Sequence, residues 1–93
     1  MKAIDSLMQS LATEATNARM PLAASIPGWM HDLITARLKR RGVVFTTRNK
    51  YGPESDEEGH NEEGRWIVKT ERFGSQPHSV VIFQPAGTRP EDA

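Results

Sequence analysis

Residues 26–44 read IPGWMHDLITARLKRRGVV, and this stretch holds the clearest structural pattern of the chain. Its apolar residues recur three and four positions apart, which predicts an amphipathic helix. Ser25 and Pro27 are typical of a helix start, and Gly42 is typical of a left-handed helix end. We therefore predict a helix over residues 27–41 that is followed at once by a strand.

The flanking sequence predicts one more helix and two more strands. Residues 3–19 have apolar residues at helical spacing, and Pro21 ends this helix because it lacks an amide proton. Alternation of apolar and polar residues predicts strands over 43–51 and 65–73, and the apolar run VVIF at 80–83 predicts a buried strand. The predicted fold class is α+β, with two helices packed on a three-stranded antiparallel meander.

The connection between the first two predicted strands is unusually acidic. Residues 52–64 hold six acids and no apolar residue that could pack, so we predict a long, flexible acidic hairpin loop. Residues 86–93 contain proline and glycine and predict a disordered tail. The length of 93 residues suits a single small domain, residues 1–93, with one modest core.

The composition limits the chemistry and the compartment. The chain has no cysteine, which excludes disulfides, thiolate metal sites and cysteine nucleophiles and favours a reducing compartment. No apolar run reaches the roughly 18 residues of a membrane span, and no signal-peptide core is visible. We therefore expect a cytoplasmic protein that does not enter a membrane.

Opposite charges are segregated along the chain although the net charge is zero, from 12 basic and 12 acidic residues. This balance argues against a general nucleic-acid coater. Stabilisation of the end of the predicted helix needs only one or two basic residues, so the larger basic cluster is a candidate binding surface. The acidic cluster that follows it in the sequence is a second candidate. The basic patch comprises Arg37, Lys39, Arg40, Arg41, Arg48 and Lys50, and the acidic set comprises Glu54, Asp56, Glu57, Glu58, Glu62 and Glu63.

No pattern of catalytic or metal-binding residues is present. His31, His60 and His78 fall in three different predicted elements, and none lies beside a serine in a nucleophile motif. Phosphate-binding glycine loops are absent, and the spacing of the acidic set does not match a calcium loop. We therefore expect neither an enzyme nor a bound metal or cofactor.

Residues 33–44, LITARLKRRGVV, followed by a hairpin with a polar tip, resemble the recognition helix and wing of winged-helix DNA-binding domains. The resemblance covers about half of the chain, from Pro27 to Glu71. It implies that Thr35, Lys39 and Arg40 approach DNA, with Arg48 and Lys50 on phosphates.

Two functional hypotheses follow, and the first is preferred. In the first, the chain is a small non-enzymatic adaptor or inhibitor that docks on a protein through its basic and acidic surfaces, and a nucleic-acid-binding protein is one such partner. In the alternative, the helix at 27–41 and the hairpin after it form a DNA-binding regulatory module. A homodimer that joins the two charged clusters is a third arrangement. The sequence leaves open whether Trp29, Met30 and Trp66 belong to the core or to an interface.

Overall fold

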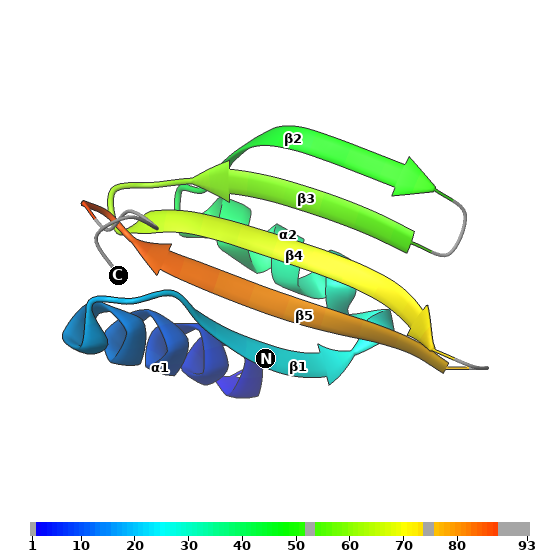
Figure 1. Cartoon of the computed structure of the whole chain (residues 1–93), viewed down its shortest axis with the longest axis horizontal. Coiled ribbons are helices and arrows are strands. Elements are labelled where there is room, and N and C mark those ends of the chain that lie inside the picture. Colours follow the sequence, from blue (N-terminus) through cyan, green and yellow to red (C-terminus); the bar gives the residue numbers. More distant parts are fainter. Residues whose placement is uncertain (1, 52–53, 74–75, 88–93) are drawn as a thin grey trace.

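The computed structural model describes residues 2–51, 54–73 and 76–87, with side chains for all of these except 2, 47–51, 54–55, 71–73 and 76–77. Its five strands form one antiparallel sheet in the order β1-β5-β4-β3-β2 (Figure 1). The α+β class is confirmed, but the sheet has five strands where the sequence predicted three. The elements are α1 (Lys2–Ala18), β1 (Leu22–Pro27), the 3₁₀ helix η1 (Gly28–Met30), α2 (His31–Arg40), β2 (Val44–Tyr51), β3 (Glu54–His60), β4 (Gly64–Phe73) and β5 (Gln76–Pro85).

The first additional strand, β1, replaces the predicted start of the second helix. Residues Leu22–Pro27 pair with β5 over their whole length, so the prediction of a helix from residue 27 with a cap at Ser25 is wrong. The helix is preceded by η1 and has no side-chain cap. Ile26 consequently packs in the core from a strand, where it is buried, and not from the helix. Pro27 is tolerated because it is the last residue of an edge strand.

The second additional strand, β3, occupies most of the predicted acidic loop. Residues Glu54–His60 lie between β2 and β4 and pair with both, so the loop prediction is wrong for this segment. The backbone of Gly59 explains why the strand fits. A Cβ on Gly59 would collide with the carbonyl oxygen of Val44, at the bulge that β2 makes after Phe45. Only a residue without a side chain allows this close approach.

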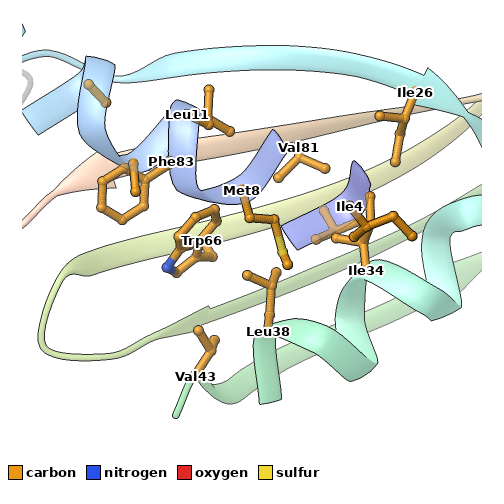
Figure 2. Close-up of a cluster of buried hydrophobic side chains, with 13 residues drawn as sticks. Ile4, Met8, Leu11, Ile26, Ile34, Leu38, Val43, Trp66, Val81 and Phe83 are labelled. Atoms are coloured by element: carbon orange, nitrogen blue, oxygen red, sulfur yellow. The ribbon is translucent and has the colours of Figure 1, made fainter. Parts of the chain in front are cut away.

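Both helices pack on one face of the sheet and enclose a single hydrophobic cluster (Figure 2). Trp66 of β4 lies at its centre, fully buried, and its ring centroid is 4.4 Å from that of Phe83 on β5. Met8 of α1 and Leu38 of α2 reach the same cluster from above the sheet. Each of these side chains contributes about 1.5–3 kcal/mol through removal from water, so this layer holds the helices in place.

Several predicted elements are confirmed. Helix α1 follows the predicted periodicity, and its buried residues recur at helical spacing. Gly42 ends the predicted helix with a φ of 89°, the left-handed conformation that glycine adopts at least cost. The predicted strands at 43–51, 65–73 and 80–83 correspond to β2, β4 and the central part of β5.

The other face of the sheet is not covered by any element in the described part of the chain (Figure 1). Residues that alternate with the buried ones along β3, β4 and β5 point to this side. The described helices include none that is long and apolar enough to cross a membrane. Residues 88–93 of the predicted tail lie outside the described residues, and residues 86–87 form a turn.

Candidate binding surfaces

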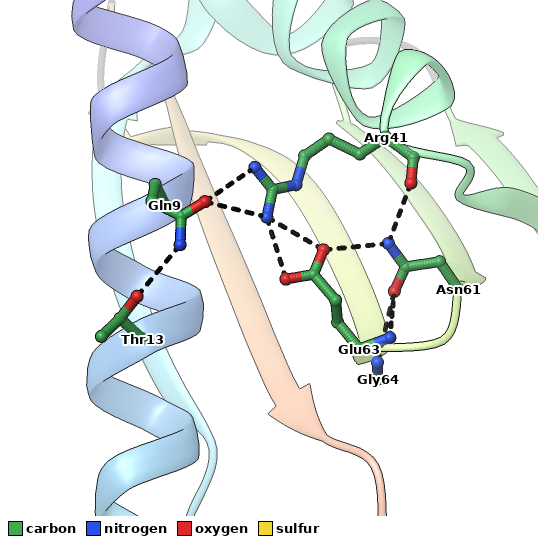
Figure 3. A network of polar contacts seen from close by, with 6 residues as sticks. All are labelled: Gln9, Thr13, Arg41, Asn61, Glu63 and Gly64. Atoms are coloured by element: carbon green, nitrogen blue, oxygen red, sulfur yellow. Dashed lines mark hydrogen bonds and ion pairs between the residues drawn. The ribbon is translucent and has the colours of Figure 1, made fainter.

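Arg41, a member of the predicted basic patch, forms an ion pair and hydrogen bonds with other residues of the same chain. Its Nη2 donates to both carboxylate oxygens of Glu63 at 2.9 Å, and both of its terminal nitrogens lie 3.4–3.5 Å from the side-chain oxygen of Gln9 (Figure 3). Its guanidinium also lies 5.8 Å from the ring centroid of Trp66. A residue held by α1, by the β3–β4 turn and by the core is a structural clamp.

The β3–β4 turn is built to present Glu63 to that clamp. The side-chain oxygen of Asn61 accepts hydrogen bonds from the backbone amides of Glu63 and Gly64, at 3.0 and 3.2 Å. The amide nitrogen of Asn61 in turn donates to the backbone carbonyl of Arg41 at 3.2 Å (Figure 3). Asn61 thereby makes an Asx-type turn and joins it to the end of α2. The contact between Arg41 and Glu63 therefore pairs one base and one acid of the two predicted clusters within a single chain.

The other basic residues of the predicted patch that lie on α2 differ in the contacts that they make within the chain. Arg37 lies 3.5 Å from a carboxylate oxygen of Asp5 on α1, with its side chain 26% exposed. Lys39 is exposed, with its ammonium 6.0 Å from the ring centroid of Phe45. Arg40 is exposed and makes no ion pair with any described residue. Arg40 is therefore the basic side chain of α2 most available to a partner.

The last two residues of the predicted basic patch lie in the part of β2, residues 47–51, where only the backbone is described. Arg48 pairs in register with Glu57, and Lys50 pairs with Ser55. The hairpin of β2 and β3 thus aligns the basic segment of the sequence with the acidic one. Glu54, the first residue of the acidic set, pairs in register with Tyr51.

The acidic set is dispersed by the alternation of β3. Glu57 points to the helix side and is buried, whereas Asp56 and Glu58 lie on the uncovered face. Glu58 forms an ion pair with Arg65 of β4. Glu62 is exposed in the turn. The structure therefore does not gather the six acids on one surface.

Glu57 belongs to a buried polar cluster that also contains His31, Thr70 and Ser79. Nε2 of His31 lies 3.6 Å from a carboxylate oxygen of Glu57, and Nδ1 lies 2.5 Å from the hydroxyl of Thr70. The Thr70 hydroxyl is 2.8 Å from that of Ser79, which donates to the backbone carbonyl of Gly28 at 3.5 Å. This cluster ties α2 and η1 to β3, β4 and β5. Sequence reasoning missed it because its members come from four separate elements.

A stripe of exposed residues runs along the outer side of η1 and α2, opposite the sheet. We call Trp29, Leu33, Ala36 and Arg40 the Trp29 stripe; their three- and four-residue spacing places them on one side of a helix. Trp29 is 67% exposed and Leu33 is 37% exposed, while the opposite side of α2 buries Ile34 and Leu38. The sequence left open whether Trp29 belongs to the core or to an interface, and the structure exposes it. Trp66 is core, as described above.

No three His, Asp or Glu side chains among the described residues come together as a group that could hold a metal ion. Comparison of the chain with models of protein families, with curated proteins and with solved structures finds no match. The argument for function therefore depends on the exposed surfaces.

Proposed function

We propose that this protein is a non-enzymatic binding module, an adaptor or inhibitor, that docks on another protein through the Trp29 stripe. The observation that carries the proposal is the 67% exposure of Trp29 beside the exposed Leu33, because neighbouring exposed apolar side chains bordered by polar residues mark interaction sites. Tryptophan and arginine dominate the energy of protein interfaces, and the stripe holds one of each.

The stripe also indicates the chemistry of the partner. Its first half, Trp29 and Leu33, is apolar, and its second half ends in Arg40, with Lys39 beside it. A complementary surface offers an apolar pocket for the indole and carboxylates beyond the pocket for the guanidinium. A rigid base supports this presentation, since the buried polar cluster holds the carbonyl of Gly28 next to Trp29.

The DNA-binding alternative has weaker support from the geometry. Arg40 and Lys39 are exposed, as a phosphate contact requires. Trp29 and Leu33, however, share the side of α2 that carries Arg40, so a groove-bound helix would set two apolar side chains against phosphates. The described elements also show α2 packed on a five-stranded sheet, without the three-helix unit of a winged helix.

The test uses the full chain as bait in an extract of the source cells, beside Trp29→Ala and the matched control Met20→Ala. Met20 is 47% exposed and is separated from η1 by the length of β1, roughly 20 Å. The partner identified by mass spectrometry is purified, and its affinity is measured by calorimetry. We expect Trp29→Ala to weaken binding about 30-fold, as a hot spot does, with Met20→Ala unchanged.

Arg40→Glu provides the second arm of the test. This substitution should lower the affinity for the same partner strongly at low salt and less at high salt, because the contact is electrostatic. A partner that binds Trp29→Ala as tightly as the wild type refutes the proposal. Wild-type binding to a labelled DNA duplex, lost in Arg40→Glu and kept in Trp29→Ala, would establish the alternative.

A further inference from the structure

The uncovered face of the sheet has an apolar strip bordered by charges. Ile67 of β4 and Ile82 of β5 are register partners at its centre, and Val80 lies beside them. All three alternate with buried residues, so they point away from the helices, and each is half-buried by its neighbours alone. Val44 of β2 shares this face through its partner His60, and 62% of it is exposed.

The charges that the structure describes on this face are balanced. Asp56 and Glu58 lie on β3, and Arg65 and Lys69 lie on β4. Glu58 and Arg65 already form an ion pair. Asp56 and Lys69 are register partners, but they do not form an ion pair with each other or with another described residue. One acid and one base on neighbouring strands therefore remain available to another molecule.

We propose that this face binds a second copy of the same chain, in a twofold-symmetric dimer of face-to-face sheets. A twofold interface uses the same surface on both partners, so it needs a surface that is complementary to itself. Neighbouring rows of opposite charge meet that need. The four strands that overlap when β3 of one copy lies above β4 of the other measure roughly 19 by 30 Å, near the low end of specific interfaces, where each partner buries about 600 Å².

The charges fix where the symmetry axis runs. An axis parallel to the strands, between β3 and β4, places β3 of one copy above β4 of the other. Asp56 of each copy then lies over Lys69 of its mate, giving two ion pairs. The same operation places β5 over β2, so that Ile82 of each copy lies over its mate's β2 at the level of residue 47, and the exposed Val44 lies over the level of Gln84. Stacked sheets pack about 10 Å apart, which side chains of these lengths fill.

The chemistry of the face also disfavours a nucleic acid as its occupant. Sheets that bind single strands use aromatic side chains for base stacking and a basic surface for the phosphates. The described side chains of this face include no phenylalanine, tyrosine or tryptophan, and their acids equal in number their lysines and arginines. A second copy supplies the opposite charge for both Asp56 and Lys69, and its sheet covers Ile67 and Ile82.

The proposal is tested by sedimentation of the full chain over a range of concentrations at low salt. We expect twice the mass of one chain, with dissociation on dilution. Ile82→Asp should give the mass of one chain. Lys69→Glu should weaken the dimer at least tenfold, because it sets two acids opposite each other, and the double variant Asp56→Lys/Lys69→Glu should restore it. Trp29→Ala should leave the dimer intact.

Circular dichroism of each variant separates loss of the dimer from loss of the fold. If Ile82→Asp unfolds, the charge variants decide, since both positions face the solvent side of the sheet. A wild-type chain that sediments as a monomer at every concentration overturns the proposal. A dimer whose dissociation constant is unchanged in Lys69→Glu overturns it as well, because the interface then lies elsewhere.

Discussion

Nε2 of His31 lies 3.6 Å from a carboxylate oxygen of Glu57, and both side chains are more than nine-tenths buried. The contact joins the first residue of α2 to the centre of an acidic strand. It explains how an acid is accommodated on the helix side of the sheet, because a buried carboxylate needs a polar partner.

We predict that Glu57→Ala lowers the free energy of unfolding by about 1–3 kcal/mol, since removal of the carboxylate leaves the buried Nε2 of His31 without its polar neighbour. Glu62→Ala, an exposed acid of the next turn, should change it by less than about 0.5 kcal/mol. Urea unfolding followed by circular dichroism measures both. A double-mutant cycle with His31→Ala should give a coupling of about 0.5–3 kcal/mol, and additive effects would show that the two groups do not interact.

Arg41 and Arg40 are adjacent in sequence, yet they should respond differently to truncation. Arg41→Ala removes the contacts to Glu63 and Gln9 and the packing on Trp66, so we expect a loss of about 1–2 kcal/mol. Arg40→Ala should cost less than about 0.5 kcal/mol, because it has no described partner. The same unfolding assay compares them, and equal losses would contradict the assignment of Arg41 as the structural residue of the pair.

The two tryptophans offer a direct test of the exposure on which the proposed function depends. With Trp66→Phe, the remaining Trp29 should emit at the long wavelengths of indole in water and be quenched readily by acrylamide. With Trp29→Phe, the remaining Trp66 should emit at shorter wavelengths and resist quenching, because it is fully buried. Similar quenching of the two single-tryptophan proteins would show that Trp29 is covered, either by its own chain or by a second copy.

We predict that Gly59 of β3 does not tolerate a side chain. Gly59→Ala introduces a Cβ into the backbone of Val44 and Phe45, and we expect a loss of about 3 kcal/mol, the upper range for overpacking. Gly42→Ala has open space around the new methyl group, so we expect it to destabilise the fold only through strain in the left-handed backbone, by about 1–2 kcal/mol. Thermal or urea unfolding ranks the two, and the opposite order would contradict the bulge at β2.

The elements that sequence reasoning predicted are those whose own residues carry the signal. Helix α1 and the body of α2 have helical periodicity, and β4 has an alternation that buries Trp66 and Val68. Strand β3, with the sequence ESDEEGH, has no such signal, because among its residues with described side chains those turned to the core are Glu57 and Gly59. It is a strand because both neighbours pair with it and because His31 compensates Glu57.

The candidate surface shows the same division. The availability of Arg40 follows from its place in the helix, and it was among the predicted binding residues. The exposure of Trp29 could not be predicted, because it depends on β1 displacing the start of the helix by several residues. The pairing of Arg41 with Glu63 depends on a turn that brings together residues far apart in the sequence.

The position of β5 between β1 and β4 governs how the chain can mature during synthesis. β1 has no strand partner until β5 has left the ribosome, although every other strand is made in the interval. Strands β2, β3 and β4 can pair first, but Trp66 packs against Phe83 only after β5 has been synthesised. Nascent chains that stop before Gln76 therefore lack Val81 and Phe83 of the core and expose the apolar side chains of α1 and β1 that pack with them. Such fragments are expected to be substrates for chaperones and proteases, not smaller folded proteins.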